Sequence, residues 1–170
     1  EYYDWIRDSF ASNKPFDQFA RELLTAEGPL SQQSAGYLYK VVPKPGETAS
    51  VVSQVLLGVR IECAQCHHHP FDRWSQADYL GMQAFFVQPK FKAGPRGELL
   101  YVADKGADPA HPRTGERIPA HPLGQAQPEE SPTGDRRRSL AEWMTTRDNP
   151  WFARNVANRA WEYLLGGGVV

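Results

Sequence analysis

The sequence predicts a mainly α protein: an irregular helical fold interrupted by one long segment rich in proline and glycine. Apolar side chains recur with the period of amphipathic helices in the first half of the chain and again near its end. Between these regions, residues 89–134 hold eight of the 14 prolines and six of the 14 glycines, which is typical of loops. We therefore divide the chain into a helical segment (1–88), a loop or insertion (89–134) and a second helical segment (135–170).

Four helices are expected in the first segment. The first two carry apolar residues at helical spacing, and the second begins after Pro15 and stops at Gly28-Pro29. A third is expected over about 48–60, delivering the chain to a cysteine motif. A fourth is expected over about 76–87, and Ser75 and Asp78 have the spacing of a capping box at its start. The apolar positions of the first two helices are Tyr2, Trp5, Ile6 and Phe10, then Phe16, Phe19, Leu23 and Leu24.

The last segment has recognisable helix signals. Asn149 is expected to N-cap a helix with Pro150 at its first position, and Gly166 to end it. The basic run Arg136–Arg138 is interpreted as a solvated helix start. Arg154 and Arg159 are expected to brace the C-terminal helices, with pairing to the carboxylates of a cofactor as the alternative.

Charge and length restrict the function classes. The chain has 170 residues with 19 basic and 20 acidic side chains, a net charge of −1. This balance gives no reason to expect nucleic acid or an anionic membrane as partner. The apolar runs are far shorter than the roughly 20 residues that a spanning helix needs, so no membrane insertion is expected. Because the chain starts without Met, we expect it to be a piece of a longer protein.

The two cysteines carry the functional signal. Cys63 and Cys66 stand three positions apart and His67 follows at once, which is the attachment pattern for c-type haem. Two thiols at this spacing can form thioethers with the vinyl groups of one haem. The adjacent imidazole can then bind iron through Nε2, with its other nitrogen donating to a carbonyl.

Three other interpretations use the same residues. A thioredoxin-like dithiol or disulfide needs only the cysteines. A zinc site could combine the cysteines with His67, His68 or His69, and with Asp72, although the usual zinc pattern separates its ligand pairs by a dozen or more residues. In the third interpretation, the two cysteines are a buried pair with only a structural role.

The sixth position on a haem iron bound by His67 has several candidate ligands. Met82 is one, although its spacing with neighbouring aromatic residues also suits a core position. His111 and His121 lie in the proline-rich segment and are further candidates. His69, two residues from the proximal ligand, cannot easily reach the opposite face, so it is expected to contact a haem carboxylate, Asp72 or a second metal. Asp72 is a further candidate for a distal or supporting position.

Two stretches resemble a known pair of domains. The segment from Leu57 to Asp72, with Ser75-Gln76, Asp78-Tyr79 and Ala84-Phe85-Phe86, resembles the cytochrome-c-like domain of unknown function of large planctomycete surface or periplasmic proteins. The second stretch resembles the start of the domain that usually accompanies it. Its matching residues are Leu140–Trp143, Asn149–Arg154, Asn158–Trp161 and Gly166–Val170.

The resemblance implies haem and export to the periplasm or cell surface, but no substrate. Helical segments precede the motif, so we do not expect the fold of an ordinary small cytochrome c. Our interpretation is a module with one covalent haem c that transfers electrons to a redox partner protein or to other domains of the same chain. The alternatives are a haem-dependent oxidoreductase or peroxidase, and a zinc-stapled surface module without redox activity.

Overall fold

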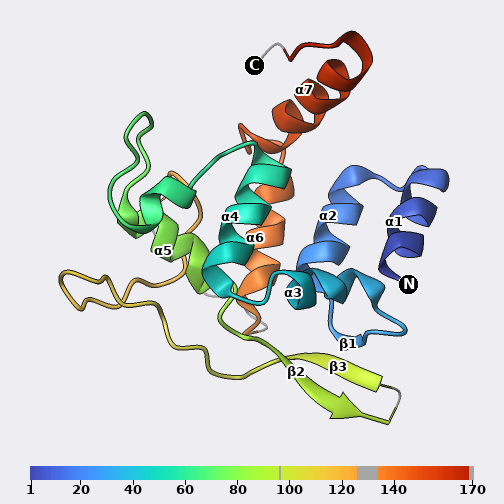
Figure 1. Ribbon diagram of the computed structural model, residues 1–170, viewed down its shortest axis with the longest axis horizontal. Helices are drawn as coiled ribbons and strands as arrows, with labels where there is room; N and C mark the ends of the chain where they lie inside the picture. The colour runs from blue at the N-terminus through green and yellow to red at the C-terminus, as the bar shows by residue number, and fades with distance from the viewer. Residues whose placement is uncertain (96, 126–133, 169–170) are drawn as a thin grey trace.

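The computed structural model describes residues 1–95, 97–125 and 134–168 (Figure 1). Parts of the predicted 89–134 loop, and Val169-Val170 of the resemblance, lie outside the described residues. The α-helices are α1 (Tyr2–Ala11), α2 (Phe16–Thr25), α3 (Leu38–Val41), α4 (Pro45–Val52), α5 (Gln76–Ala84), α6 (Arg136–Thr145) and α7 (Phe152–Leu165). The short turns are η1 (Ser34–Tyr37), η2 (Ser53–Leu57) and η3 (Glu62–Gln65), and the strands are β1 (Gly28–Pro29), β2 (Pro89–Gly94) and β3 (Gly97–Val102). The predicted mainly α class is confirmed.

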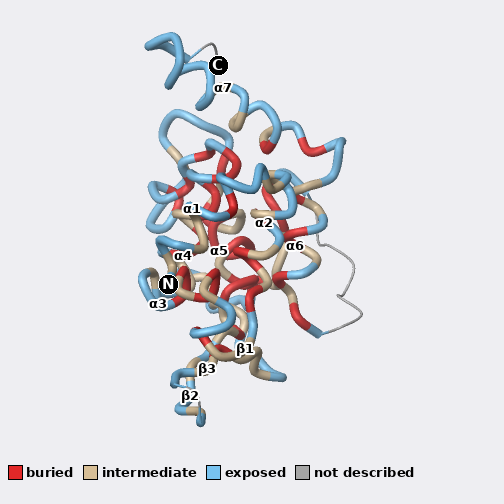
Figure 2. Tube along the Cα trace, turned by 90° about the vertical axis from the view of Figure 1, so that its right-hand side faces the viewer, coloured by how far each residue is buried: buried red, intermediate tan, exposed pale blue. Residues whose placement is uncertain are grey.

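One core lies between α2, α4, α5 and α6. α2 packs against α6 and α4 packs against α5, and the buried part of the trace gathers among them (Figure 2). Leu24, Leu56 and Leu140 are completely or almost completely buried there. Each comes from an apolar stripe at helical spacing, so hydrophobic burial fixes how these helices meet.

The 89–134 segment is not the continuous loop that composition predicts. β2 and β3 form an antiparallel hairpin at its start, and β1 adds to β3 to give a sheet in the order β1-β3-β2. Leu100 on β3 is fully buried and is the register partner of Phe91 on β2. The prediction was wrong here because a hairpin concentrates proline and glycine where it starts and turns, as a loop does: Pro89 opens β2, and Gly97 has a φ of 94°.

Helix boundaries differ from the expectations in three places, the first of which is α5, which ends at Ala84 rather than near residue 87. The helix expected over 48–60 is α4 followed by η2, a π-helical turn that ends at Gly58. Asn149 does cap α7, since its Oδ1 accepts from the backbone N–H groups of Trp151 and Phe152, but the helix begins two residues later than expected. The predicted capping box of Ser75 and Asp78 is confirmed at the start of α5.

The basic run is not wholly solvated. Arg137 is 0 % exposed and its guanidinium pairs with Asp135 at 3.0 Å and donates to the Ala26 carbonyl at 3.0 Å. It also lies over the ring of Tyr39 at 5.3 Å, and burial raises the pKa of that phenol to about 12. The expectation of a solvated helix start was wrong for Arg137, because its side of the first turn of α6 faces the end of α2.

In the second helical segment, α6 and the start of α7 contribute to this core, whereas the rest of α7 does not. α6 contributes Leu140 and Met144 to the same cluster as α2, so the packing is continuous across the expected domain boundary. α7 projects from the body, and within its described residues only Phe152 is buried (Figures 1 and 2). Of the helices described, none has the length and apolar character needed to cross a membrane.

Candidate functional site

The cysteine motif lies on a short 3₁₀ turn pinned to the core. Ile61 and Ala64 are both fully buried, whereas Cys63 and Cys66 are both exposed and free. In a 3₁₀ turn, side chains three positions apart point the same way. Ile61, just before η3, and Ala64, within it, therefore face the core. Cys63 lies within η3 and Cys66 at its end, so the same spacing predicts that the two exposed side chains share a side of the turn that faces away from the core.

His67 follows at the end of this turn and is exposed. Its Nδ1 lies 2.6 Å from the carbonyl oxygen of His68. A carbonyl oxygen can only accept, so in the neutral imidazole this contact assigns the proton to Nδ1 and leaves the lone pair on Nε2. Nε2 is the nitrogen through which a proximal haem ligand binds iron.

The neighbouring histidines have other arrangements. His68 is exposed, and the half-buried His69 accepts at Nδ1 from the Phe71 backbone N–H at 3.3 Å. The backbone N–H of His69 donates to the Trp74 carbonyl at 2.8 Å, which closes the loop that carries the histidines. Asp72 accepts from the backbone of Arg73, and among the described contacts none joins it to His69.

The candidates for the sixth position are dispersed. Met82 is fully buried in the core on α5. His111 accepts at Nδ1 from the backbone N–H groups of Arg113 and Thr114 in a local turn. Within the described ranges, no three His, Cys, Asp or Glu side chains form a group that could hold a metal ion.

His121 is placed against the helix that follows the motif. Its ring lies over Gly81 on α5, so closely that a Cβ on this glycine would be 2.2 Å from His121 Cε1. The His121 backbone N–H donates to the Gly81 carbonyl at 3.3 Å, and Nδ1 lies 3.0 Å from the Pro119 carbonyl. Glycine at position 81 therefore lets the 119–125 segment pack on α5.

We expect Gly81→Ala to destabilise the protein by about 1–3 kcal/mol, because the methyl group must displace the His121 ring. In a His121→Ala background the same substitution should stabilise it by up to about 1 kcal/mol, because alanine is the better helix former. Urea unfolding of the four proteins measures both values. An equal effect of Gly81→Ala in the two backgrounds would show that His121 does not pack on α5.

An aromatic cluster beside the motif loop is a feature that sequence reasoning missed. The rings of Trp74 and Trp151 meet edge to face at 5.8 Å, and the Arg73 guanidinium lies over both, at 4.7 and 5.7 Å from the ring centroids. The indole N–H of Trp74 is buried and lacks a hydrogen-bond partner among the described residues. Such orphan donors are rare. The sequence carries no signal for this contact, because Trp74 and Trp151 are far apart along the chain.

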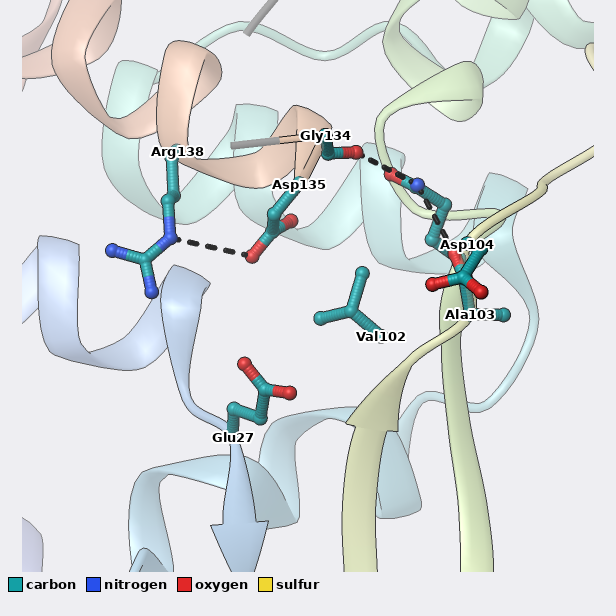
Figure 3. A pocket seen from close by; sticks show the side chains of 8 residues that line it. Glu27, Val102, Ala103, Asp104, Gly134, Asp135 and Arg138 are labelled. Carbon is teal, nitrogen blue, oxygen red and sulfur yellow. Dashed lines mark hydrogen bonds and ion pairs between the residues drawn. The ribbon is translucent and has the colours of Figure 1, made fainter. Parts of the chain in front are cut away.

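A separate hollow of about 480 Å³ opens between the end of β3 and the start of α6 (Figure 3). Glu27, Asp104 and Asp135 line it together with Arg138. Asp135 is already neutralised by Arg137 and, at 3.8 Å, by Arg138. The described lining includes no residue of the cysteine motif, so this hollow is not part of the candidate site.

Two family models match the chain. Residues 1–90 match the family PSCyt2, described as "Protein of unknown function (DUF1549)", and residues 136–170 match PSD1, described as "Protein of unknown function (DUF1553)". No curated protein and no solved structure matches the chain. Because the first match covers more than half of the 170 residues, the chain belongs to the PSCyt2 family.

Proposed function

We propose that this protein holds one covalent c-type haem on the Cys63–His67 turn and serves as an electron-transfer module. The observation that carries the proposal is the local geometry: two free, exposed cysteines, one within a 3₁₀ turn and one at its end, followed at once by an imidazole whose Nδ1 contacts a backbone carbonyl and so leaves Nε2 for a ligand. This donor set fits a c-type haem, which needs two thioether bonds and one axial nitrogen.

The chain's own residues would attach and orient the cofactor. Cys63 and Cys66 would each add a thiol S–H across a haem vinyl group, so that both thioethers form without loss of atoms. His67 would ligate iron through Nε2 while its Nδ1–H donates to the His68 carbonyl, which fixes the ring's tautomer. Bound haem supplies the one-electron redox chemistry, and the protein sets its potential through ligand and burial.

The exposure of the motif supports a transfer role. Covalent anchoring keeps a haem in place where the surface is open, and an open position shortens the path to a redox partner protein or to another domain of the same chain. Covalent haem attachment also agrees with export to the periplasm or cell surface, which the family resemblance implies.

A second candidate function follows from the dispersed sixth ligands. Met82 is buried in the core, His111 is bound into its own turn and His121 packs on α5. An iron ligated by His67 alone would leave one position open to small molecules, as in a haem-dependent oxidoreductase or peroxidase.

Spectroscopy of the chain matured with a c-haem assembly system tests both functions. We expect a Soret band that survives acid–acetone extraction. His67→Ala removes the axial nitrogen, so the covalent haem should remain while the Soret band shifts and the spin state of the iron differs from that of the wild type. His68→Ala should leave the spectrum unchanged. A spectrum that shifts on adding cyanide favours the enzyme, and a fixed low-spin spectrum favours the carrier. Stoichiometric zinc without a Soret band would refute haem binding.

A further inference from the structure

The helix that leads into the cysteine motif ends in an unusual turn. α4 continues into the π-helical η2, and the chain reverses at Gly58 with a φ of 73°. π-helical turns are rare and frequently mark functional sites. Ser53, at the start of η2, has a buried hydroxyl without a hydrogen-bond partner in the described part of the chain. The backbone here departs from the α-helical pattern immediately before the candidate site.

α7 provides side-chain partners for this turn. Asn155 donates through Nδ2 to the Val55 carbonyl at 2.8 Å, and Arg159 donates through Nη2 to the Gln54 carbonyl at 3.1 Å. Arg159 Nε also donates to Asn155 Oδ1 at 3.3 Å, which links the two side chains. Carbonyl groups at a helix C-terminus lack intrahelical partners and attract positive charge, so an amide and a guanidinium suit this position.

Gly58 makes the contact close. A Cβ at this position would lie 2.8 Å from Asn155 Oδ1, and the positive φ also favours glycine. The backbone at Gly58 therefore packs directly against the Asn155 side chain of α7.

This contact joins the two family segments. The turn lies within residues 1–90, whereas Asn155 and Arg159 lie within 136–170. Cys63 follows Gly58 by only five positions, and Val59 and Ile61 between them are buried. A shift of the turn would therefore pass along a short, packed segment to the cysteines.

We propose that Asn155 and Arg159 are positioning residues for the Cys63–His67 turn, so that α7 controls how the motif presents its thiols and imidazole. The part of this inference that concerns haem rests on the proposed function, whereas the hold on the turn does not. Any partner or domain that engages α7 would act on the site through this contact.

Asn155→Asp is the sharpest variant for testing it. The side chain keeps its shape and its acceptor for Arg159, but a carboxylate oxygen replaces the donor that faces the Val55 carbonyl. Arg154→Ala is the matched control, since Arg154 is exposed on the same helix. Hydrogen exchange of the cofactor-free chain should show the Val59 and Ala64 amides, which donate to Ser53 and Ile61 carbonyls, exchanging about tenfold faster in Asn155→Asp.

Amides of α2 report global stability in the same experiment and should not change. In the matured protein, Asn155→Asp should also shift the reduction potential or lower the haem yield, and Arg154→Ala should do neither. The inference is overturned if Asn155→Asp has the exchange rates and the reduction potential of the wild type. It is also overturned if the amides exchange faster while the reduction potential and the haem yield stay unchanged. A wild-type chain that takes up no haem would refute the proposed function instead, and the exchange rates would still show whether α7 holds the turn.

Discussion

Replacing both motif cysteines by serine should abolish covalent haem attachment completely. Serine keeps the size of each side chain but cannot form the thioether, so no haem should remain with the chain after denaturing extraction. Both cysteines are exposed and neither packs in the core, so the double variant should keep the wild-type fold and free energy of unfolding within about 0.5 kcal/mol. Absorption after acid–acetone extraction and urea unfolding measure the two effects.

The single variants sharpen this expectation. Cys63→Ser and Cys66→Ser should each retain at most one thioether and take up less haem than the wild type. An undiminished covalent Soret band in the double variant would contradict the assignment, because these are the two cysteines of the chain.

Replacing Arg137 by alanine should have the largest effect on stability, a loss of about 3–5 kcal/mol in the free energy of unfolding. The side chain is fully buried, and its removal leaves the Asp135 carboxylate and the Ala26 carbonyl without their main partner. Arg137→Lys keeps the charge but loses the two-pronged pairing with Asp135, so an intermediate loss is expected. Urea unfolding at neutral pH measures each value.

Arg138→Ala is the control for this effect. Arg138 is half exposed and 3.8 Å from the same carboxylate, so its removal should cost less than about 1 kcal/mol. Equal losses for Arg137→Ala and Arg138→Ala would show that the buried pairing does not hold α6 to α2.

Local patterns predicted the parts of the fold that depend on neighbours in sequence. The Ser75–Asp78 capping box, the helix after Pro15 and the end of the last helix at Gly166 all lie where short-range hydrogen bonds and backbone preferences place them. The cysteine motif is equally local: Cys63 lies within η3, Cys66 at its end, and both are exposed.

Features that depend on distant contacts were not predictable. Arg137 belongs to a basic run that looks solvated, and only the approach of α2 buries it. Gly81 and His121 are far apart in sequence, and no sequence pattern indicates that they are in contact. The bonds from Asn155 to η2 were equally hidden, because side-chain capping across about a hundred residues leaves no periodic signal.

The central claim is tested most directly by locating the cofactor on the chain. Trypsin cleavage after Arg60 and Arg73 releases the peptide 61–73, which contains both cysteines and His67. After maturation with a c-haem assembly system, mass spectrometry should find this peptide carrying one haem, with one iron and no zinc per chain. An unmodified peptide with two thiols open to alkylation, or one zinc per chain in place of iron, would contradict the account.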